Sequence, residues 1–116
     1  MLNTNTECEF TKILENSYRS VNIGLVNEIK ILCHKARINF HDVISAASTK
    51  PFGFNPFLPG PGVGGHCIPI DPVFLDWFGK KIKAKTDFIN LARKKNIQVT
   101  NFVINNILNL LKKINF

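Results

Sequence analysis

A chain of 116 residues, 45% of them hydrophobic, has the length and apolar content of one domain with a buried core. It contains no run of about 18 apolar residues, so no membrane span is expected, and its first residues lack the pattern of a secretory signal. The three cysteines, Cys8, Cys33 and Cys67, have no metal-type spacing. We therefore expect reduced thiols, a cytoplasmic location and no metal site.

The net charge of +7 is concentrated in the C-terminal third of the chain. Residues 80–116 contain nine Lys and Arg against one acid, whereas residues 1–79 contain six basic and seven acidic residues. A basic segment of this kind can attract nucleic acid or a membrane surface. No nucleic-acid-binding motif accompanies it, so a solvated helix face is the favoured interpretation and neither partner is expected.

A long helix is predicted from about Glu9 to Lys35, weakened only at Gly24, by about 1 kcal/mol relative to alanine. A polar line of Lys12, Asn16 and Arg19 follows one of its faces, and spacing alone would assign such a line to solvent. On another face, apolar residues at steps of three or four predict one buried stripe. The stripe consists of Leu14, Tyr18, Val21, Leu25, Ile29, Leu32 and Ala36.

A short helix is predicted from Asp42 to Ser48, with His41 or Asp42 at its start. Residues 50–65 contain four of the six prolines and five of the seven glycines, so they cannot form a regular element. Aromatic side chains in this loop are expected to pack onto the helices, because so many exposed rings would be costly. These side chains are Phe52, Phe54 and Phe57.

Two more helices are predicted in the second half of the chain. The first runs from Val73 to Lys81, where Gly79 and the lysines signal its end. The second is long, from about Asp87 to Leu111, and Thr86 is placed to cap it. The pattern therefore predicts an all-α fold of two long helices, shorter helices between them and a Pro/Gly-rich loop across one end. The side chains expected to face the core from residues 73–81 are Phe74, Leu75, Trp77 and Phe78.

The segment GPGVGGHCIPIDP, residues 60–72, places Cys67 at the end of a glycine-rich loop and Asp71 four residues later. Pro69 or Pro72 can occupy the first turn of a helix, which would put Cys67 just ahead of that helix. A thiol in such a position is shifted towards thiolate. A thiolate beside a carboxylate, under a loop of free N–H groups, has the equipment for covalent attack on a carbonyl.

Two other interpretations of this loop have to be weighed. A lone cysteine in an intracellular protein is more often a small buried hydrophobe than a nucleophile. Gly60, Gly62 and Gly65 also match the spacing of a dinucleotide-binding fingerprint. We reject the fingerprint because prolines ahead of the loop forbid the strand that it requires, and no acidic residue is placed to bind a ribose.

Residues 59–72, PGPGVGGHCIPIDP, resemble the active-site segment of the UDP-glucose/GDP-mannose dehydrogenase family, in the branch that acts on UDP-N-acetylhexosamines. Residues 10–23 resemble the start of the family's central helix, and residues 87–93 resemble its next helix. The similarity thins beyond Asn96, where Thr100 stands in place of the usual proline. It implies that residues 9–116 form the helical central domain, after a frayed segment 1–8, without the flanking Rossmann-type NAD-binding and nucleotide-sugar domains.

The resemblance implies a double oxidation for polysaccharide biosynthesis. The C6 alcohol of a UDP-sugar passes hydride to NAD⁺, and Cys67 adds to the resulting aldehyde as a thiohemiacetal. A second hydride transfer gives a thioester, which water cleaves to a uronate. Lys12 and Asn16 would stabilise the developing oxyanion, and Asp71 would position or deprotonate the water. Residues implied to contact the substrate are Gly64, Gly65, Phe57 and Arg19.

The resemblance also implies a homodimer formed through the long central helix, and His66 is treated as structural. Three alternatives remain open at this stage: an inactive truncated remnant, a stand-alone helical dimerisation module, and a basic nucleic-acid-binding protein. The dehydrogenase interpretation depends on one expectation. Folding should bring the Cys67 sulfur and the Lys12 amine, from distant parts of the chain, into one shared hollow.

Overall fold

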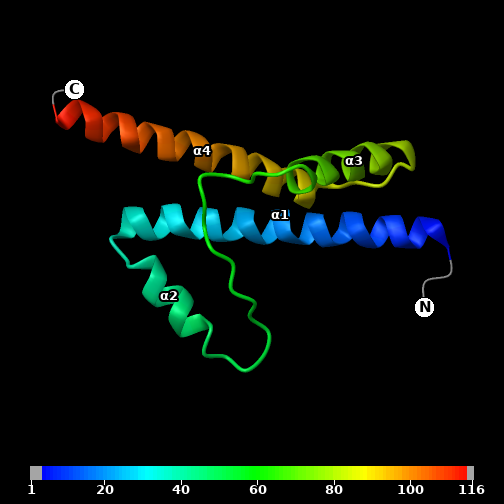
Figure 1. The fold of residues 1–116 in the computed structure, drawn as a ribbon, viewed down its shortest axis with the longest axis horizontal. Coiled ribbons are helices and arrows are strands. Elements are labelled where there is room, and N and C mark those ends of the chain that lie inside the picture. The colour runs from blue at the N-terminus through cyan, green and yellow to red at the C-terminus, as the bar shows by residue number, and fades with distance from the viewer. Residues whose placement is uncertain (1–3, 115–116) are drawn as a thin grey trace.

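The computed structural model describes residues 4–114, and these form four α-helices without a β-strand (Figure 1). The helices are α1 (Asn5–Ala36), α2 (Phe40–Ala47), α3 (Cys67–Lys81) and α4 (Asp87–Lys113). Helices α1 and α4 lie side by side and run in the same direction, whereas α3 runs antiparallel beside the N-terminal half of α1 (Figure 1). The predicted all-α fold is confirmed for the described residues. None of their helices combines the length and apolarity needed to cross a membrane.

Helix α1 begins four residues before the predicted Glu9, so it includes residues 5–8 of the segment predicted to fray. The cause is a capping box: the Thr4 hydroxyl accepts from the Glu7 N–H, and the Thr4 N–H donates to the Glu7 carboxylate, both at 3.2 Å. The rest of the predicted frayed segment, residues 1–3, lies outside the described residues. Counting 32 residues at about 1.5 Å each, α1 is a rod of about 48 Å.

The face of α1 that packs on α3 and α4 is made of small and polar residues, so the predicted buried apolar stripe is wrong. Leu14, Leu25 and Leu32 are 59%, 58% and 59% exposed. Small side chains allow the helix backbones to approach closely: a Cβ added at Gly24 would lie 3.1 Å from the carbonyl oxygen of Ala92 on α4. The buried face comprises Asn16, Ser17, Ser20, Gly24 and Asn27.

Helix α2 starts at Phe40, two residues before the predicted Asp42, because the Asn39 side chain accepts from the His41 N–H and caps it. Phe40 is 1% exposed and forms a small core with Val26 and Cys33. The loop that follows is irregular, as predicted. The aromatic residues predicted to pack this loop onto the helices have different environments. Phe57 packs against this core, as predicted. The prediction is wrong for Phe52, which is 86% exposed at the loop's outer end.

Helix α3 starts at Cys67, so Pro69 lies in its first turn, one of the two alternatives predicted, and Pro72 lies further along inside the helix. Phe74 and Trp77 are 49% and 54% exposed, so their predicted core-facing orientation is wrong. The contact with α1 is made by another face of α3, through Asp71 and the ring of Phe78, which meets that of Phe10 edge to face at 6.3 Å.

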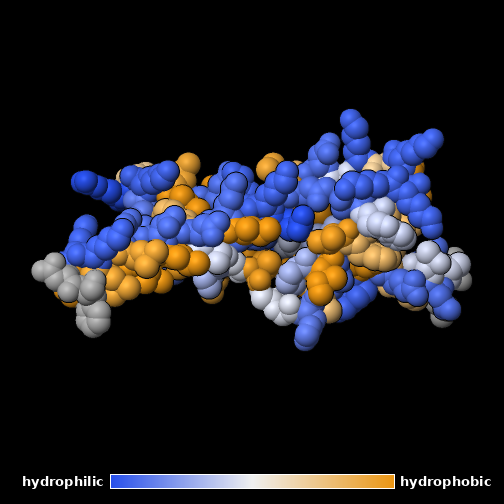
Figure 2. Space-filling view, turned by 90° about the horizontal axis from the view of Figure 1, so that it is seen from above, coloured by the Kyte–Doolittle hydropathy of each residue, from blue (hydrophilic) through white to orange (hydrophobic). Residues whose placement is uncertain are grey.

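Helix α4 starts at the predicted residue, Asp87, but its cap differs from the prediction. Thr86 occupies the N-cap position, and its hydroxyl donates to the Asp76 carboxylate at 2.6 Å instead of bonding the helix's own N–H groups. Figure 2, a view onto α3 and α4, shows hydrophobic side chains left at the surface beside the C-terminal end of the chain. The exposed apolar residues of the second half of α4 are Ile104, Ile107, Leu108, Leu110 and Leu111.

Candidate active site

The centre of the candidate site is a hydrogen-bonded chain of three side chains. Asn16 on α1 donates through Nδ2 to Asp71 Oδ2 on α3 at 2.6 Å. Arg19, one turn further along α1, donates through Nη1 to Asn16 Oδ1 at 2.8 Å. Both polar atoms of the Asn16 amide are therefore engaged, and this fixes the orientation of the amide. Asn16 is 2% exposed, so the middle of this hydrogen-bonded series is buried, and the series ends at the partly exposed Asp71 carboxylate.

The other two predicted catalytic residues flank this bond. Lys12 lies one turn before Asn16 on α1, and Cys67 lies one turn before Asp71 on α3. Because the two helices are antiparallel, these turns extend in opposite directions, and the Cα atoms of Lys12 and Cys67 are offset by about eight residues, or about 12 Å, along the helix axes. Both side chains are exposed, and within residues 4–114 neither makes a hydrogen bond. The expectation that Lys12 and Cys67 share one hollow therefore remains a prediction.

Cys67 is the first residue of α3, where the sequence had predicted it just ahead of the helix. His66 occupies the N-cap position without a side-chain cap bond, so the first N–H groups of α3 have no intrahelical partner and no cap. The positive end of the helix dipole therefore acts on the Cys67 thiol. A Cβ added at Gly64 or Gly65 would meet no atom within 4 Å, so the space beside these glycines is open, and Cys67 itself is exposed.

The remaining predicted substrate contacts are used within the chain. Arg19 is exposed but holds the Asn16 amide. Phe57 is half-buried, with its ring edge to face against Tyr18 at 5.8 Å, so it packs the loop onto α1. The neighbouring Asn55 donates to the Tyr18 hydroxyl at 3.2 Å. These contacts attach the outer part of the loop to α1.

Sequence reasoning missed three polar residues that hold the inner part of the loop. The Gly60 N–H donates to Asn27 Oδ1 at 3.0 Å, and Asn27 Nδ2 donates to Asn96 Oδ1 at 3.1 Å. Thr100 on α4 donates through its hydroxyl to the Pro61 carbonyl at 2.6 Å. One signal was present in the sequence: Ser17, Ser20, Gly24 and Asn27 are three or four residues apart, the spacing of one helix face on which another helix can pack closely.

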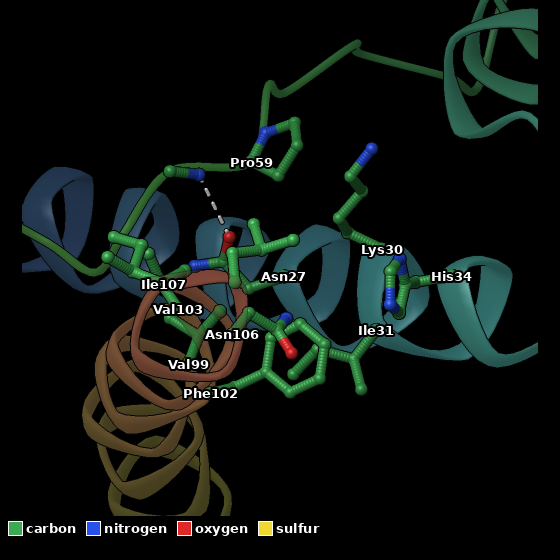
Figure 3. A pocket seen from close by; sticks show the side chains of 12 residues that line it. Asn27, Lys30, Ile31, His34, Pro59, Val99, Phe102, Val103, Asn106 and Ile107 are labelled. Carbon is green, nitrogen blue, oxygen red and sulfur yellow. Dashed lines mark hydrogen bonds between the residues drawn. The ribbon is translucent and has the colours of Figure 1, made fainter. Parts of the chain in front are cut away.

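A cavity of about 320 Å³ lies between α1, α4 and the loop (Figure 3). Its walls are mostly apolar, with Lys30 and His34 contributed by α1 (Figure 3). None of the four predicted catalytic residues lines it. Its apolar lining would suit a small apolar ligand, but the groups equipped for chemistry lie at the α1–α3 contact.

The described residues do not fit a nicotinamide dinucleotide. They contain no strand, and so no strand-turn-helix unit to hold a pyrophosphate. In the glycine loop, a Cβ at Gly62 would lie 2.6 Å from the Thr100 hydroxyl, so the loop packs against its own α4 there. The same residues contain no cluster of His, Cys, Asp and Glu able to hold a metal ion.

A helical domain with a cysteine-bearing glycine loop, joined to a Lys/Asn-bearing helix, is the arrangement expected of a nucleotide-sugar dehydrogenase. The chain belongs to the UDP-glucose/GDP-mannose dehydrogenase family: residues 6–98 match the family's central domain. The predicted family is thereby confirmed.

The similarity extends to individual relatives. The chain is 42% identical over 106 residues to the UDP-N-acetyl-D-mannosamine dehydrogenase of Methanococcus maripaludis, covering 91% of this chain and 24% of that protein. A solved UDP-D-ManNAc dehydrogenase from Pyrococcus horikoshii superposes with a TM-score of 0.86 at 35% identity, over 100% of this chain and 27% of the other. An NDP-N-acetyl-D-galactosaminuronic acid dehydrogenase from Methanosarcina mazei gives 0.83 at 29% identity, covering 96% and 26%. The chain thus spans about a quarter of the length of these relatives.

Proposed function

We propose that this chain supplies the covalent and acid–base groups of an NAD-dependent UDP-sugar 6-dehydrogenase, which oxidises the C6 alcohol of a UDP-N-acetylhexosamine to a carboxylate for polysaccharide biosynthesis. The similar proteins are named as dehydrogenases of N-acetylated nucleotide sugars. The observation that carries the proposal is the 2.6 Å bond between Asn16 and Asp71, two predicted catalytic residues that lie 55 positions apart. NAD, the proposed hydride acceptor, would be bound outside the described residues.

Cys67 is the proposed nucleophile. Its thiolate attacks the C6 aldehyde carbon, a C–S bond forms, and the carbonyl electron pair moves to oxygen to give a thiohemiacetal oxyanion. The thiol lies in the first turn of α3 and is exposed, so the substrate carbonyl can approach it. The exposed ammonium of Lys12 is the proposed cation for the oxyanion, and it can deliver the proton that neutralises it. In the second oxidation that proton would return to the Lys12 amine while hydride leaves C6 for a second NAD⁺, which would convert the thiohemiacetal into the thioester. The substrate would lie across the offset between Lys12 and Cys67.

Asp71 is the proposed base for thioester hydrolysis. With Oδ2 occupied by Asn16, its other oxygen is available to take a proton from water as the water attacks the thioester carbonyl. The C–S bond then breaks, the thiolate of Cys67 leaves, and the product is a carboxylate. Because Asn16 is almost completely buried, we assign it first to positioning Asp71 and second to donating its remaining amide hydrogen to the substrate oxygen.

Alkylation of the native chain tests the role of Cys67. Cys8 is an internal control, because it is also exposed and lies in the first turn of another helix. We expect iodoacetamide to label Cys67 ahead of Cys8 in the folded chain, and to label both at the same rate in denaturant. Peptide mass spectrometry measures both rates in one sample, and Cys67→Ser assigns the signal. Equal, slow labelling of the two in the folded chain would contradict the proposal.

We further propose that the chain forms a homodimer through the apolar stripe of α1. Support comes from the exposure of this stripe: Leu14, Leu25 and Leu32 are each close to 60% exposed, whereas the residues of α1 that pack within the chain lie on another face. Apolar surface of this extent on a helix marks an interaction site. Association without chemistry remains the second candidate function, and the alkylation experiment separates the two because a module that only dimerises needs no activated thiol.

A further inference from the structure

The first residues of the glycine loop are held by side chains at two consecutive positions. At Gly60 the backbone N–H donates to Asn27 Oδ1, a bond drawn as a dashed line in Figure 3. At Pro61 the backbone carbonyl accepts from the Thr100 hydroxyl at 2.6 Å. These bonds tie the loop to α1 and to α4, so its position depends on how those two helices pack.

The anchor on α1 is itself part of a buried network. Asn27 and Asn96 are 1% and 2% exposed, and Asn27 Nδ2 donates to Asn96 Oδ1. Asn96 Nδ2 in turn donates to the Ser20 carbonyl at 2.9 Å. Both amides therefore have a fixed orientation, and Asn27 Oδ1 is left facing Gly60. A buried acceptor needs a donor, and the loop N–H supplies it.

The anchor on α4 depends on a close approach that only glycine permits. Gly62 has φ +136°, and a Cβ there would lie 2.6 Å from the Thr100 hydroxyl and 3.4 Å from the Asn96 carbonyl. The loop thus crosses directly over the Asn96–Thr100 turn of α4.

We propose that Asn27, Asn96 and Thr100 form a clamp that positions Cys67. Beyond Pro61, the link to Cys67 contains three glycines, Gly62, Gly64 and Gly65, and so has little stiffness of its own. The clamp fixes one end of this link, and the bond from Asn16 to Asp71 fixes α3 at the other. Asn27, Asn96 and Thr100 are positioning residues, and their catalytic meaning rests on the proposed function of Cys67.

Two substitutions at one position test the clamp in the full chain. Thr100→Val removes the hydroxyl and keeps the branched shape, whereas Thr100→Ser retains the hydroxyl. We expect Thr100→Val to accelerate amide hydrogen exchange at Gly60, the residue of this stretch whose N–H is hydrogen-bonded, by about two- to tenfold, and Thr100→Ser to restore the wild-type rate. In Thr100→Val the alkylation rate of Cys67, and its dependence on pH, should move towards those of Cys8, whose own rate should not change.

A second variant reaches the same contact from the loop. Gly62→Ala should accelerate exchange of the Gly60 amide as well, because the new methyl group overlaps the Thr100 hydroxyl and displaces the loop. Unchanged exchange in both Thr100→Val and Gly62→Ala, or a Thr100→Ser variant that behaves like Thr100→Val, would overturn the clamp. If Cys67 of the wild type labels no faster than Cys8 while Thr100→Val still loosens the loop, the proposed function fails and the clamp stands as a structural device.

Discussion

Asn16 and Asp71 are joined by a 2.6 Å hydrogen bond that connects α1 to α3, with the amide buried and the carboxylate partly exposed. The Arg19 guanidinium holds the far side of the amide at 2.8 Å. A buried group thus determines where a partly exposed, chemically useful group stands. This arrangement lets the packing of two helices set the geometry of the candidate site.

Removing the Asn16 amide should lower the stability of the fold and leave the Asp71 carboxylate less firmly positioned. We expect Asn16→Ala to reduce the free energy of unfolding by about 1–3 kcal/mol, because the Asp71 carboxylate and the Arg19 guanidinium both lose a partner. Urea unfolding followed by circular dichroism measures the change. A double-mutant cycle with Asp71→Ala should give a coupling energy of about 1 kcal/mol, and effects that add within about 0.5 kcal/mol would show that the bond contributes little.

The helices and the loop could be predicted because their signals are local. The start of α4, the irregular loop and the family of the segment around Cys67 all follow from residues close together in the sequence. The starts of α1 and α2 were misplaced because their caps, Thr4 with Glu7 and Asn39 with His41, act through side-chain hydrogen bonds that apolar periodicity does not record.

The packing faces could not be predicted from hydrophobic periodicity. On α1 the apolar stripe is the stronger pattern, yet the face buried within the chain carries Ser20, Gly24 and Asn27. Close backbone approach and buried amide bonds replace apolar burial there, and both depend on residues some 70 positions away, such as Asn96. The contact between Asn16 and Asp71 is equally non-local, and only the resemblance to a family suggested it.

Glycine at position 79 is required by the turn that joins α3 to α4. A Cβ there would lie 2.9 Å from both the Ala84 carbonyl oxygen and Thr86 Cγ2. Alanine normally favours a helix over glycine by about 1 kcal/mol, but a rigid backbone oxygen cannot move aside. Gly79→Ala should therefore lower the free energy of unfolding by about 1–3 kcal/mol in urea titrations. Gly24→Ala, with a 3.1 Å approach, should cost less, and a gain in stability from Gly79→Ala would refute the proposed overlap.

The stability of the chain should fall in acid through Asp76. Hydrogen bonds from Lys80, Thr86 and Asn90, at 2.7, 2.6 and 2.5 Å, hold the pKa of Asp76 well below its usual value. Because the unfolded state takes up a proton at higher pH than the folded state, this stabilisation is complete above about pH 5 and is lost progressively below about pH 4. Lys80 is 75% exposed, so added salt should weaken its share more than those of Thr86 and Asn90.

Asp76→Asn is the variant that isolates this effect. It should lower the urea midpoint at pH 7 and flatten the loss of stability between about pH 5 and pH 2. Glu15→Gln, at an exposed position within α1, is the control and should leave the shape of the pH curve unchanged. Parallel curves for wild type and Asp76→Asn would show that another carboxylate governs acid unfolding.

Because the proposed homodimer forms through the exposed stripe of α1, a charged side chain introduced into this stripe should weaken dimerisation. Leu25 is 58% exposed near the middle of α1 and would be buried in a symmetric interface. One substitution would therefore remove this apolar contact from both protomers of the dimer. Leu25→Lys should therefore raise the dimer dissociation constant by at least about tenfold in sedimentation equilibrium. Ile82→Lys changes a residue of similar exposure, 57%, in the turn after α3 and should leave association unchanged. A wild-type chain that stays monomeric at high concentration, or equal effects of the two lysines, would remove α1 as the interface.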